Sequence, residues 1–146
     1  QDQAAIDAAR VRLAPWIDRV TLIHDNFANL AQVLEKSGVS GADGMLFDLG
    51  VSSPQLDDAA RGFSYMHDAP LDMRMDTQAP LTAYEIVNTW SGEELRRILP
   101  DYGEARYAPA LAKAIVRARE TQPIRTTHGL VETIHRAMHP AALRDM

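Results

Sequence analysis

Cysteine is absent from the 146-residue sequence, which excludes disulfides, thiolate nucleophiles and cysteine-ligated zinc. No apolar run approaches the ~18 residues that a membrane-spanning helix needs, and the first residues lack the basic-then-apolar order of a signal peptide. We predict no metal site, because His135 and His139 have helical spacing without the glutamate of an HExxH motif. The hydrophobic fraction of 46% is enough for a buried core, so we expect a soluble, cytoplasmic protein.

The net charge of −5 conceals two regions of opposite sign. Residues 1–105 have a net charge of −9, whereas residues 106–144 have a net charge of +5. The basic residues of the second region are Arg106, Lys113, Arg117, Arg119, Arg125, Arg136 and Arg144. Such a cluster is typical either of a solvated helical face or of a surface that contacts nucleic acid. Composition alone leaves both interpretations open.

Helix-like and strand-like segments alternate in the first third of the chain. Apolar residues recur at helical spacing over residues 2–13 and 28–37. The short apolar runs at residues 20–23 and 44–49 are typical of buried strands. A helix, a strand, a helix and a strand with short connections predict βα units and a parallel sheet.

From residue 81 onward the pattern is helical throughout. Two pairs of residues have capping-box spacing and predict helix starts, namely Thr82 with Glu85 and Ser91 with Glu94. Pro109 fits the first turn of a third helix, and a fourth is expected over residues 127–138. Residues 50–80 show no sustained period, and a long irregular segment of this kind inside a compact domain is usually either a functional loop or a wrongly assigned element.

Two strands are too few for an independent parallel sheet. The sequence therefore predicts an α/β fold in which part of a larger sheet carries an inserted helical subdomain. We expect one domain over residues 1–80, with part of the sheet and the loop, and a second, all-helical domain over residues 81–146.

Polar residues follow both predicted strands, where open α/β sheets bind their ligands. Residues 24–27 (His-Asp-Asn-Phe) follow the first strand, and Asp48 ends the second. An aspartate there accepts hydrogen bonds from ribose hydroxyls or an amine, or else only caps the next turn. A serine hydrolase is a poor interpretation, because Pro54 stands where a GxSxG motif needs its second glycine.

Residues 48–76 contain three long motifs, DLGVSSPQLD, RGFS and PLDMRMD. In this order they resemble the S-adenosylmethionine-dependent methyltransferase family called RsmH, formerly MraW. The resemblance continues through LTAYEIVNTWSGEELRRIL and DYGEARYAPALAKAIV, so it covers nearly the whole chain. It implies a Rossmann-like methyltransferase sheet and methylation of the N4 amine of a cytidine in the decoding region of bacterial 16S rRNA. The small ribosomal subunit is then the expected partner.

The resemblance also implies roles for individual residues. Three residues match family contacts to S-adenosylmethionine, namely Phe27, Asp48 and Gln55. The segment Ser52-Ser53-Pro54 resembles the [SND]-P-P-Y motif that holds a target amine, although the second proline and the tyrosine are missing. Positioning and hydrogen-bond acceptors are what such a weak nucleophile needs. We therefore assign Ser52, Ser53 and Pro54 to the cytidine amine.

RNA contacts are expected from basic residues in two places. Arg74, in PLDMRMD, either touches RNA or forms a structural pair with Asp72. Lys113 and Arg117 project from the polar side of the third predicted helix, and the resemblance makes residues 81–146 an RNA-recognition subdomain.

In the family, the glycine-rich cofactor loop and the acidic residue that binds the ribose come earlier in the chain than the position that matches Gln1. Neither is present in this sequence. The resemblance thus implies an internal piece of a longer enzyme, which by itself binds the cofactor weakly and is inactive. Bare sheet edges would favour a homodimer. Two alternatives remain: a non-catalytic helical module that binds RNA or a protein, and a methyltransferase that acts on another RNA or on DNA.

Overall fold

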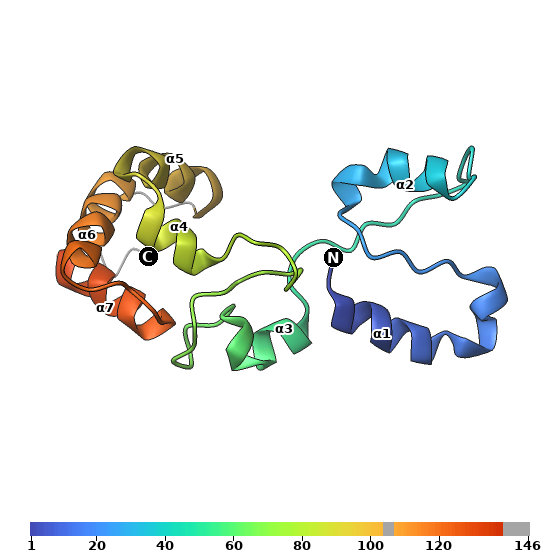
Figure 1. Cartoon of the computed structure of the whole chain (residues 1–146), viewed down its shortest axis with the longest axis horizontal. Coiled ribbons are helices and arrows are strands. Elements are labelled where there is room, and N and C mark those ends of the chain that lie inside the picture. The colour runs from blue at the N-terminus through green and yellow to red at the C-terminus, as the bar shows by residue number, and fades with distance from the viewer. Residues whose placement is uncertain (104–106, 139–146) are drawn as a thin grey trace. The chain divides into compact units, whose positions relative to one another are not determined.

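The computed structural model describes residues 1–103 and 107–138, and all regular secondary structure in these ranges is helical (Figure 1). One isolated bridge between Pro70 and Thr126 is the only β-type pairing among them. No helix in the described ranges is long and apolar enough to cross a membrane. The elements in chain order are α1 (Gln3–Arg12), η1 (Ala14–Arg19), η2 (Phe27–Asn29), α2 (Leu30–Lys36), α3 (Ser53–Asp57), η3 (Ala59–Arg61), α4 (Ala83–Thr89), α5 (Gly92–Gly103), α6 (Ala108–Thr121) and α7 (Thr127–Ala137).

The predicted α/β fold with a partial Rossmann-like sheet is wrong for the described residues. Residues 20–23 and 44–49 have no strand partners, and every residue from 41 to 50 is exposed. Apolar, β-branched residues indicate burial, but a strand also needs a neighbour for its N–H and C=O groups. Neither segment has one in the described chain. The homodimer was predicted because a partial sheet would have exposed edges. The described residues form no sheet, so this reason for a homodimer no longer applies.

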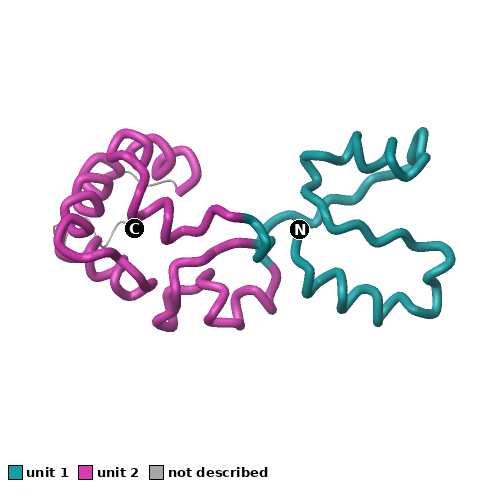
Figure 2. Tube along the Cα trace, viewed as in Figure 1, with its two compact units in different colours: residues 1–51, 75–79 teal, residues 52–74, 80–146 magenta. Residues whose placement is uncertain are grey.

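The chain divides into two compact units (Figure 2). Unit 1 consists of residues 1–51 and 75–79, and none of its residues is buried. Unit 2 consists of residues 52–74 and 80–146, and its described part holds the hydrophobic core. The functions predicted for residues 1–80 and 81–146 stay predictions.

Side-chain caps set the starts of α4 and α5, as the sequence predicts. The N–H of Thr82 donates to Glu85 Oε2 at 3.0 Å, and the N–H of Glu85 donates to Thr82 Oγ1 at 3.2 Å. Ser91 and Glu94 form the same pair of bonds, at 2.7 and 3.2 Å. These bonds from Ser91 hold the pKa of Glu94 below its usual value, because they favour the carboxylate. The helices predicted at residues 2–13, 28–37 and 127–138 and the one that begins near Pro109 are also confirmed.

The core of unit 2 is built around α6, which packs against α4, α5 and α7. Its buried cluster consists of Leu71, Val87, Leu95, Ala112, Ile115 and Ile124. Leu95 is the most deeply buried large side chain, at 2% exposure. A core of this kind supplies most of the stability of short helices, which are marginal in isolation.

Two polar side chains tie α4 to the rest of unit 2. Asn88 donates to the carbonyls of Tyr84 and Ile124 and accepts from the N–H of Ile124, each bond at 2.8 Å. Arg119 of α6 donates to the carbonyls of Val87, at 2.6 Å, and Trp90. Arg119 therefore supplies hydrogen-bond donors to carbonyls at the C-terminal end of α4, which have no partners within the helix.

Gly62 marks the closest backbone approach in unit 2. Its φ is +70°, and a Cβ placed there would lie 2.4 Å from the carbonyl oxygen of Pro70 and 3.0 Å from the nitrogen of Asp72. The RGFS and PLDMRMD motifs therefore pack backbone against backbone, which only glycine permits.

We predict that Gly62→Ala lowers the free energy of unfolding of unit 2 by about 3 kcal/mol, because backbone strain and a clash add. Gly38→Ala is the matched control, since Gly38 has the same φ of +70° and nothing within 4 Å of its Cβ position. Because Gly38 lies in unit 1, the control should leave the free energy of unfolding of unit 2 close to that of wild type. Denaturation followed by circular dichroism measures both. Equal, small effects would show that the close approach does not exist.

Candidate functional site

Two phenylalanines of unit 1 form an exposed aromatic corner. The rings of Phe27 and Phe47 meet edge to face, with centroids 6.3 Å apart and an interplanar angle of 73°. Both side chains are about half exposed, at 58% and 52%. Aromatic faces left open to solvent in this way can pack against a flat ligand.

The turn before Phe27 is fixed by its own side chains. Asn26 caps η2 by accepting from the N–H of Ala28 at 2.9 Å. Asp25 accepts from the side chain of Asn29 and from the N–H of Asn26, and these bonds lower the pKa of Asp25. The turn thus holds Phe27 in place through local hydrogen bonds.

Asp48 directly follows Phe47, whose ring contacts that of Phe27. Its carboxylate is exposed and forms no hydrogen bond or ion pair with the residues that the structure describes. A carboxylate beside an aromatic corner suits a ligand with a flat ring and hydroxyl or amine donors.

Gln55 is the third predicted cofactor contact, and it lies in unit 2. It is buried, at 6% exposure, and its Oε1 accepts from the N–H of Ser52 at 2.9 Å. The side chain therefore holds the start of α3, where Ser52 is the N-cap residue. Ser52, Ser53 and Pro54 are themselves exposed. Gln55 thus presents these three residues to solvent.

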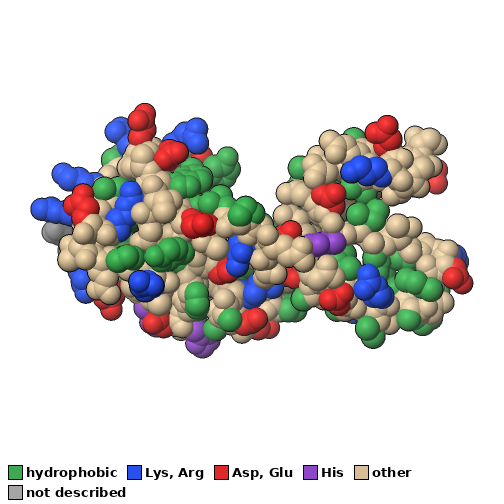
Figure 3. Space-filling model, in the orientation of Figure 1, with side chains coloured by type: hydrophobic (Ala, Val, Ile, Leu, Met, Phe, Trp, Pro, Cys, Tyr) green, Lys and Arg blue, Asp and Glu red, His purple; other side chains and the backbone are tan. Residues whose placement is uncertain are grey.

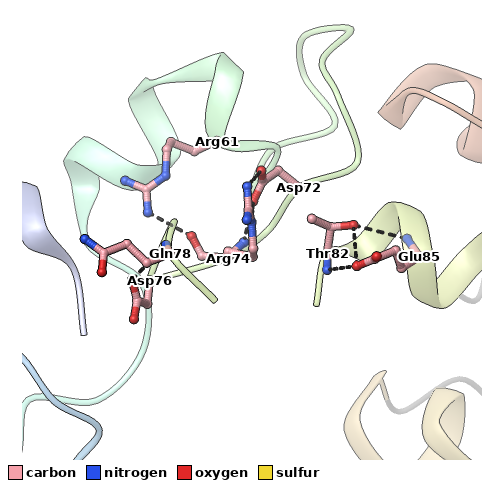
Figure 4. A network of polar contacts seen from close by, with 7 residues as sticks. All are labelled: Arg61, Asp72, Arg74, Asp76, Gln78, Thr82 and Glu85. Carbon is pink, nitrogen blue, oxygen red and sulfur yellow. Dashed lines mark hydrogen bonds and ion pairs between the residues drawn. The ribbon is translucent and has the colours of Figure 1, made fainter. Parts of the chain in front are cut away.

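An arginine–aspartate network orders the loop that contains Arg74 (Figure 4). The Nε and Nη2 of Arg74 donate to the two carboxylate oxygens of Asp72 at 2.9 and 2.7 Å, and the N–H of Arg74 donates to Asp72 at 2.9 Å. Arg61 donates to the carbonyl of Arg74 at 2.9 Å. These bonds hold Met73 between them at a φ of +60°, which is unusual for a residue with a side chain. Arg74 is thus engaged in the structural pair, and any contact with RNA has to compete with it.

The Arg74 guanidinium keeps the pKa of Asp72 below its usual value. The charge-assisted, bidentate geometry favours the ionised carboxylate, and it outweighs the partial burial that would raise the pKa.

Lys113 and Arg117 lie on the exposed face of α6 and line a cleft between α6 and α7. Arg136 of α7 lines the same cleft, although sequence reasoning counted it only in the overall basic excess. The sequence predicted a helix over residues 127–138, which contains Arg136. It did not predict that this helix packs against α6, and that packing brings Arg136 to the cleft. No group of three or more acidic or histidine side chains in the described ranges is arranged to hold a metal, and His139 lies outside those ranges.

The sequence of the whole site region matches a known family. The family model described as the MraW methylase family matches residues 1–145. The chain belongs to this family. The resemblance drawn from DLGVSSPQLD, RGFS and PLDMRMD is therefore confirmed.

Curated relatives are similar along nearly the entire chain. A protein of Paenibacillus sp. (strain JDR-2) named ribosomal RNA small subunit methyltransferase H is 56% identical over 150 residues, which cover 99% of this chain and 48% of that protein. Proteins of the same name from Brevibacillus brevis and Symbiobacterium thermophilum are 54% and 53% identical, over 99% of this chain and 46% of each relative. The chain thus spans about half the length of the curated relatives it matches.

We predict that Asp72→Asn lowers the free energy of unfolding by about 1.5 kcal/mol at pH 7, because it removes charge-assisted bonds to Arg74. The folded pKa of Asp72 is lowered, so its contribution is complete above the unfolded value and disappears as the pH falls below about 4. The gap between variant and wild type should therefore close in acid. Urea denaturation at pH 7 and pH 3 measures it.

Asp57→Asn is the control, because Asp57 is exposed on α3 and forms no side-chain bond with the described residues. This substitution should change stability little at either pH. A difference between Asp72→Asn and wild type that stays constant from pH 7 to pH 3 would contradict the ion-pair explanation.

Proposed function

We propose that the protein carrying this sequence transfers a methyl group from S-adenosylmethionine to the N4 amine of a cytidine in 16S rRNA. Membership of the MraW methylase family and the names of the relatives support a methyltransferase that acts on small-subunit rRNA. The structural observation that carries the proposal is the exposed Phe27–Phe47 corner, followed in the chain by Asp48, whose carboxylate has no partner among the described residues. An rRNA substrate implies a cytoplasmic enzyme.

The residues of the corner fit the chemistry of S-adenosylmethionine. Phe27 offers an exposed aromatic surface for the adenine ring, and Asp48 offers an acceptor for hydroxyl or amine donors. When bound, the cofactor supplies a methyl group attached to a positively charged sulfur. Gln55 would contribute by fixing the start of α3 through its bond to Ser52.

The target amine needs positioning more than activation. The lone pair of a cytosine amine is delocalised into the ring, so an enzyme gains chiefly by holding the nitrogen in line with the methyl group. The hydroxyl of Ser53 is exposed and forms no hydrogen bond with the described chain, so it is available to accept from the amine. Acceptors there would stabilise the positive charge that develops on nitrogen. The cytidine has to leave its stack to reach such a site.

The proposal predicts that Asp48→Ala, in a full-length protein carrying this sequence, lowers methyl transfer about 10–100-fold, as expected for the loss of a hydrogen bond between ligand and a charged group. The assay measures transfer of a labelled methyl group to small ribosomal subunits from cells that lack the modification, followed by mapping of the methylated nucleotide.

Asp18→Ala serves as the control, because Asp18 is an exposed carboxylate of η1 without a partner in the described chain. It should retain wild-type transfer. If wild-type protein binds RNA but transfers no methyl group, the non-catalytic binding module is the better account. A methyl group found at a position other than a cytidine N4 would contradict the proposed specificity.

A further inference from the structure

The cleft between α6 and α7 is lined by basic side chains and by small ones. It encloses about 470 Å³ and is lined by Lys113, Arg117, Arg136 and Thr133, with alanines as the remaining lining residues. Among the residues that the structure describes, no acidic side chain and no aromatic or large aliphatic side chain lines it. Protein partners are usually anchored by buried aromatic or large aliphatic side chains, so this lining favours a small, anionic group over a protein surface.

The arginines and lysines of unit 2 fall into two classes. Some are used by the fold, because Arg61, Arg74 and Arg119 all donate to carbonyl or carboxylate oxygens within the unit. Lys113 and Arg117, by contrast, are exposed and form no hydrogen bond or ion pair with the residues that the structure describes. Their charges therefore stabilise no contact within the described part of the fold.

The spacing of Lys113 and Arg117 is unfavourable for the helix by itself. Two like charges four positions apart lie on the same face of α6 and repel each other. Glu120, three positions after Arg117, is not within ion-pair distance of it in the described structure. A repulsive pair without a structural partner is what a site for an external anion requires.

Arg136 reaches the same cleft from α7. Its Nη2 donates to Glu132 Oε2 at 2.9 Å, but both side chains are largely exposed, at 80% and 65%. Exposed pairs of this kind are weak, so an anion in the cleft can take the guanidinium from Glu132. Glu132 does not line the cleft.

The basic surface continues on the other side of α6. A second hollow of about 400 Å³ there is lined by three basic side chains, Arg96 of α5 with Lys113 and Arg117, and by one acidic side chain, Glu120. Figure 3 shows several Lys and Arg side chains on the part of unit 2 that carries α5, α6 and α7, with Asp and Glu side chains among them. The cations therefore form a stripe across three helices, which matches successive charges along a backbone better than a single small anion.

We infer that the α6–α7 cleft binds phosphates of an RNA backbone, with Lys113, Arg117 and Arg136 as the phosphate contacts and Arg96 extending the track. The inference rests on the proposed function for its choice of RNA. It adds a sequence-independent contact that positions the substrate, whereas base contacts elsewhere would specify it.

The test measures binding of a fluorescent single-stranded RNA of mixed sequence to the chain at several salt concentrations. The double variant Lys113→Gln/Arg117→Gln should bind on the order of ten-fold more weakly, and the slope of log K against log salt should fall by about 1.4. Its melting temperature should stay the same or rise, because a repulsive pair is removed. Glu132→Gln should bind RNA more tightly, because it releases Arg136.

Arg97→Gln is the control, since Arg97 lines neither of the two hollows that contain Lys113 and Arg117 and instead lies with Arg96, Glu93 and Glu94 in a third. It removes one positive charge, where the double variant removes two, and should leave the salt slope close to that of wild type. The inference is overturned if the double variant keeps wild-type affinity and slope, or if Arg97→Gln has the same effect as it does. Displacement of the RNA by an acidic peptide but not by unlabelled RNA would also overturn it, in favour of a protein partner.

A methyl-transfer assay with full-length protein separates this inference from the proposed function. If the double variant transfers methyl groups with the same KM for ribosomal subunits as wild type, the phosphate site is refuted and the proposed function stands. If wild type transfers no methyl group but binds RNA through Lys113 and Arg117, the proposed function fails and the phosphate site remains.

Discussion

The structure of unit 2 depends on the backbone hydrogen bonds that dock residues 67–72 onto the starts of α4 and α7. The N–H of Leu71 donates to the carbonyl of Arg125, and the carbonyl of Leu71 accepts from Tyr84. The N–H of Thr127 donates to the carbonyl of Ala69 in turn. These bonds insert Leu71, at 3% exposure, into the helical core. Residues 67–72, which have no regular structure, thereby become part of the core. The loop residues on either side of them are held in place by this docking.

The same docking determines what the loop can present. Gly62 allows the RGFS motif to lie against this segment, and Arg61 and Asp72 then hold Arg74 and the strained backbone of Met73. Strain of this kind persists only where the surroundings determine it, and it is common at functional sites. The loop motifs that identify the family are thus also the residues that build the loop. The basic face of α6 differs from the loop, because Lys113 and Arg117 form no hydrogen bond or ion pair with the described residues and are exposed to a ligand.

The sequence predicted the helices of unit 2 well because their signals are local. The pairs at Thr82 and Ser91 form caps whose geometry depends on only four residues. The prediction of strands, for example at residues 44–49, was wrong because a strand needs pairing partners that a local sequence pattern does not reveal. α3 was missed because five residues are too few to show a helical period. Among the site residues, the Asp72–Arg74 pair was one of two interpretations that the sequence left open. Phe47 was not a candidate, because its contact with Phe27 is tertiary and no local pattern reveals it.

Amide hydrogen exchange of the chain tests the central claim, that the docked segment belongs to the helical core, most directly. The account predicts that the amides of Leu71, Tyr84 and Thr127 exchange as slowly as that of Ile115 in α6, through one cooperative opening of unit 2. The amides of residues 44–49, which are exposed and outside regular structure, should exchange fast. If Leu71 and Thr127 exchange as fast as residues 44–49 while Ile115 stays protected, the segment is not docked and the account is wrong.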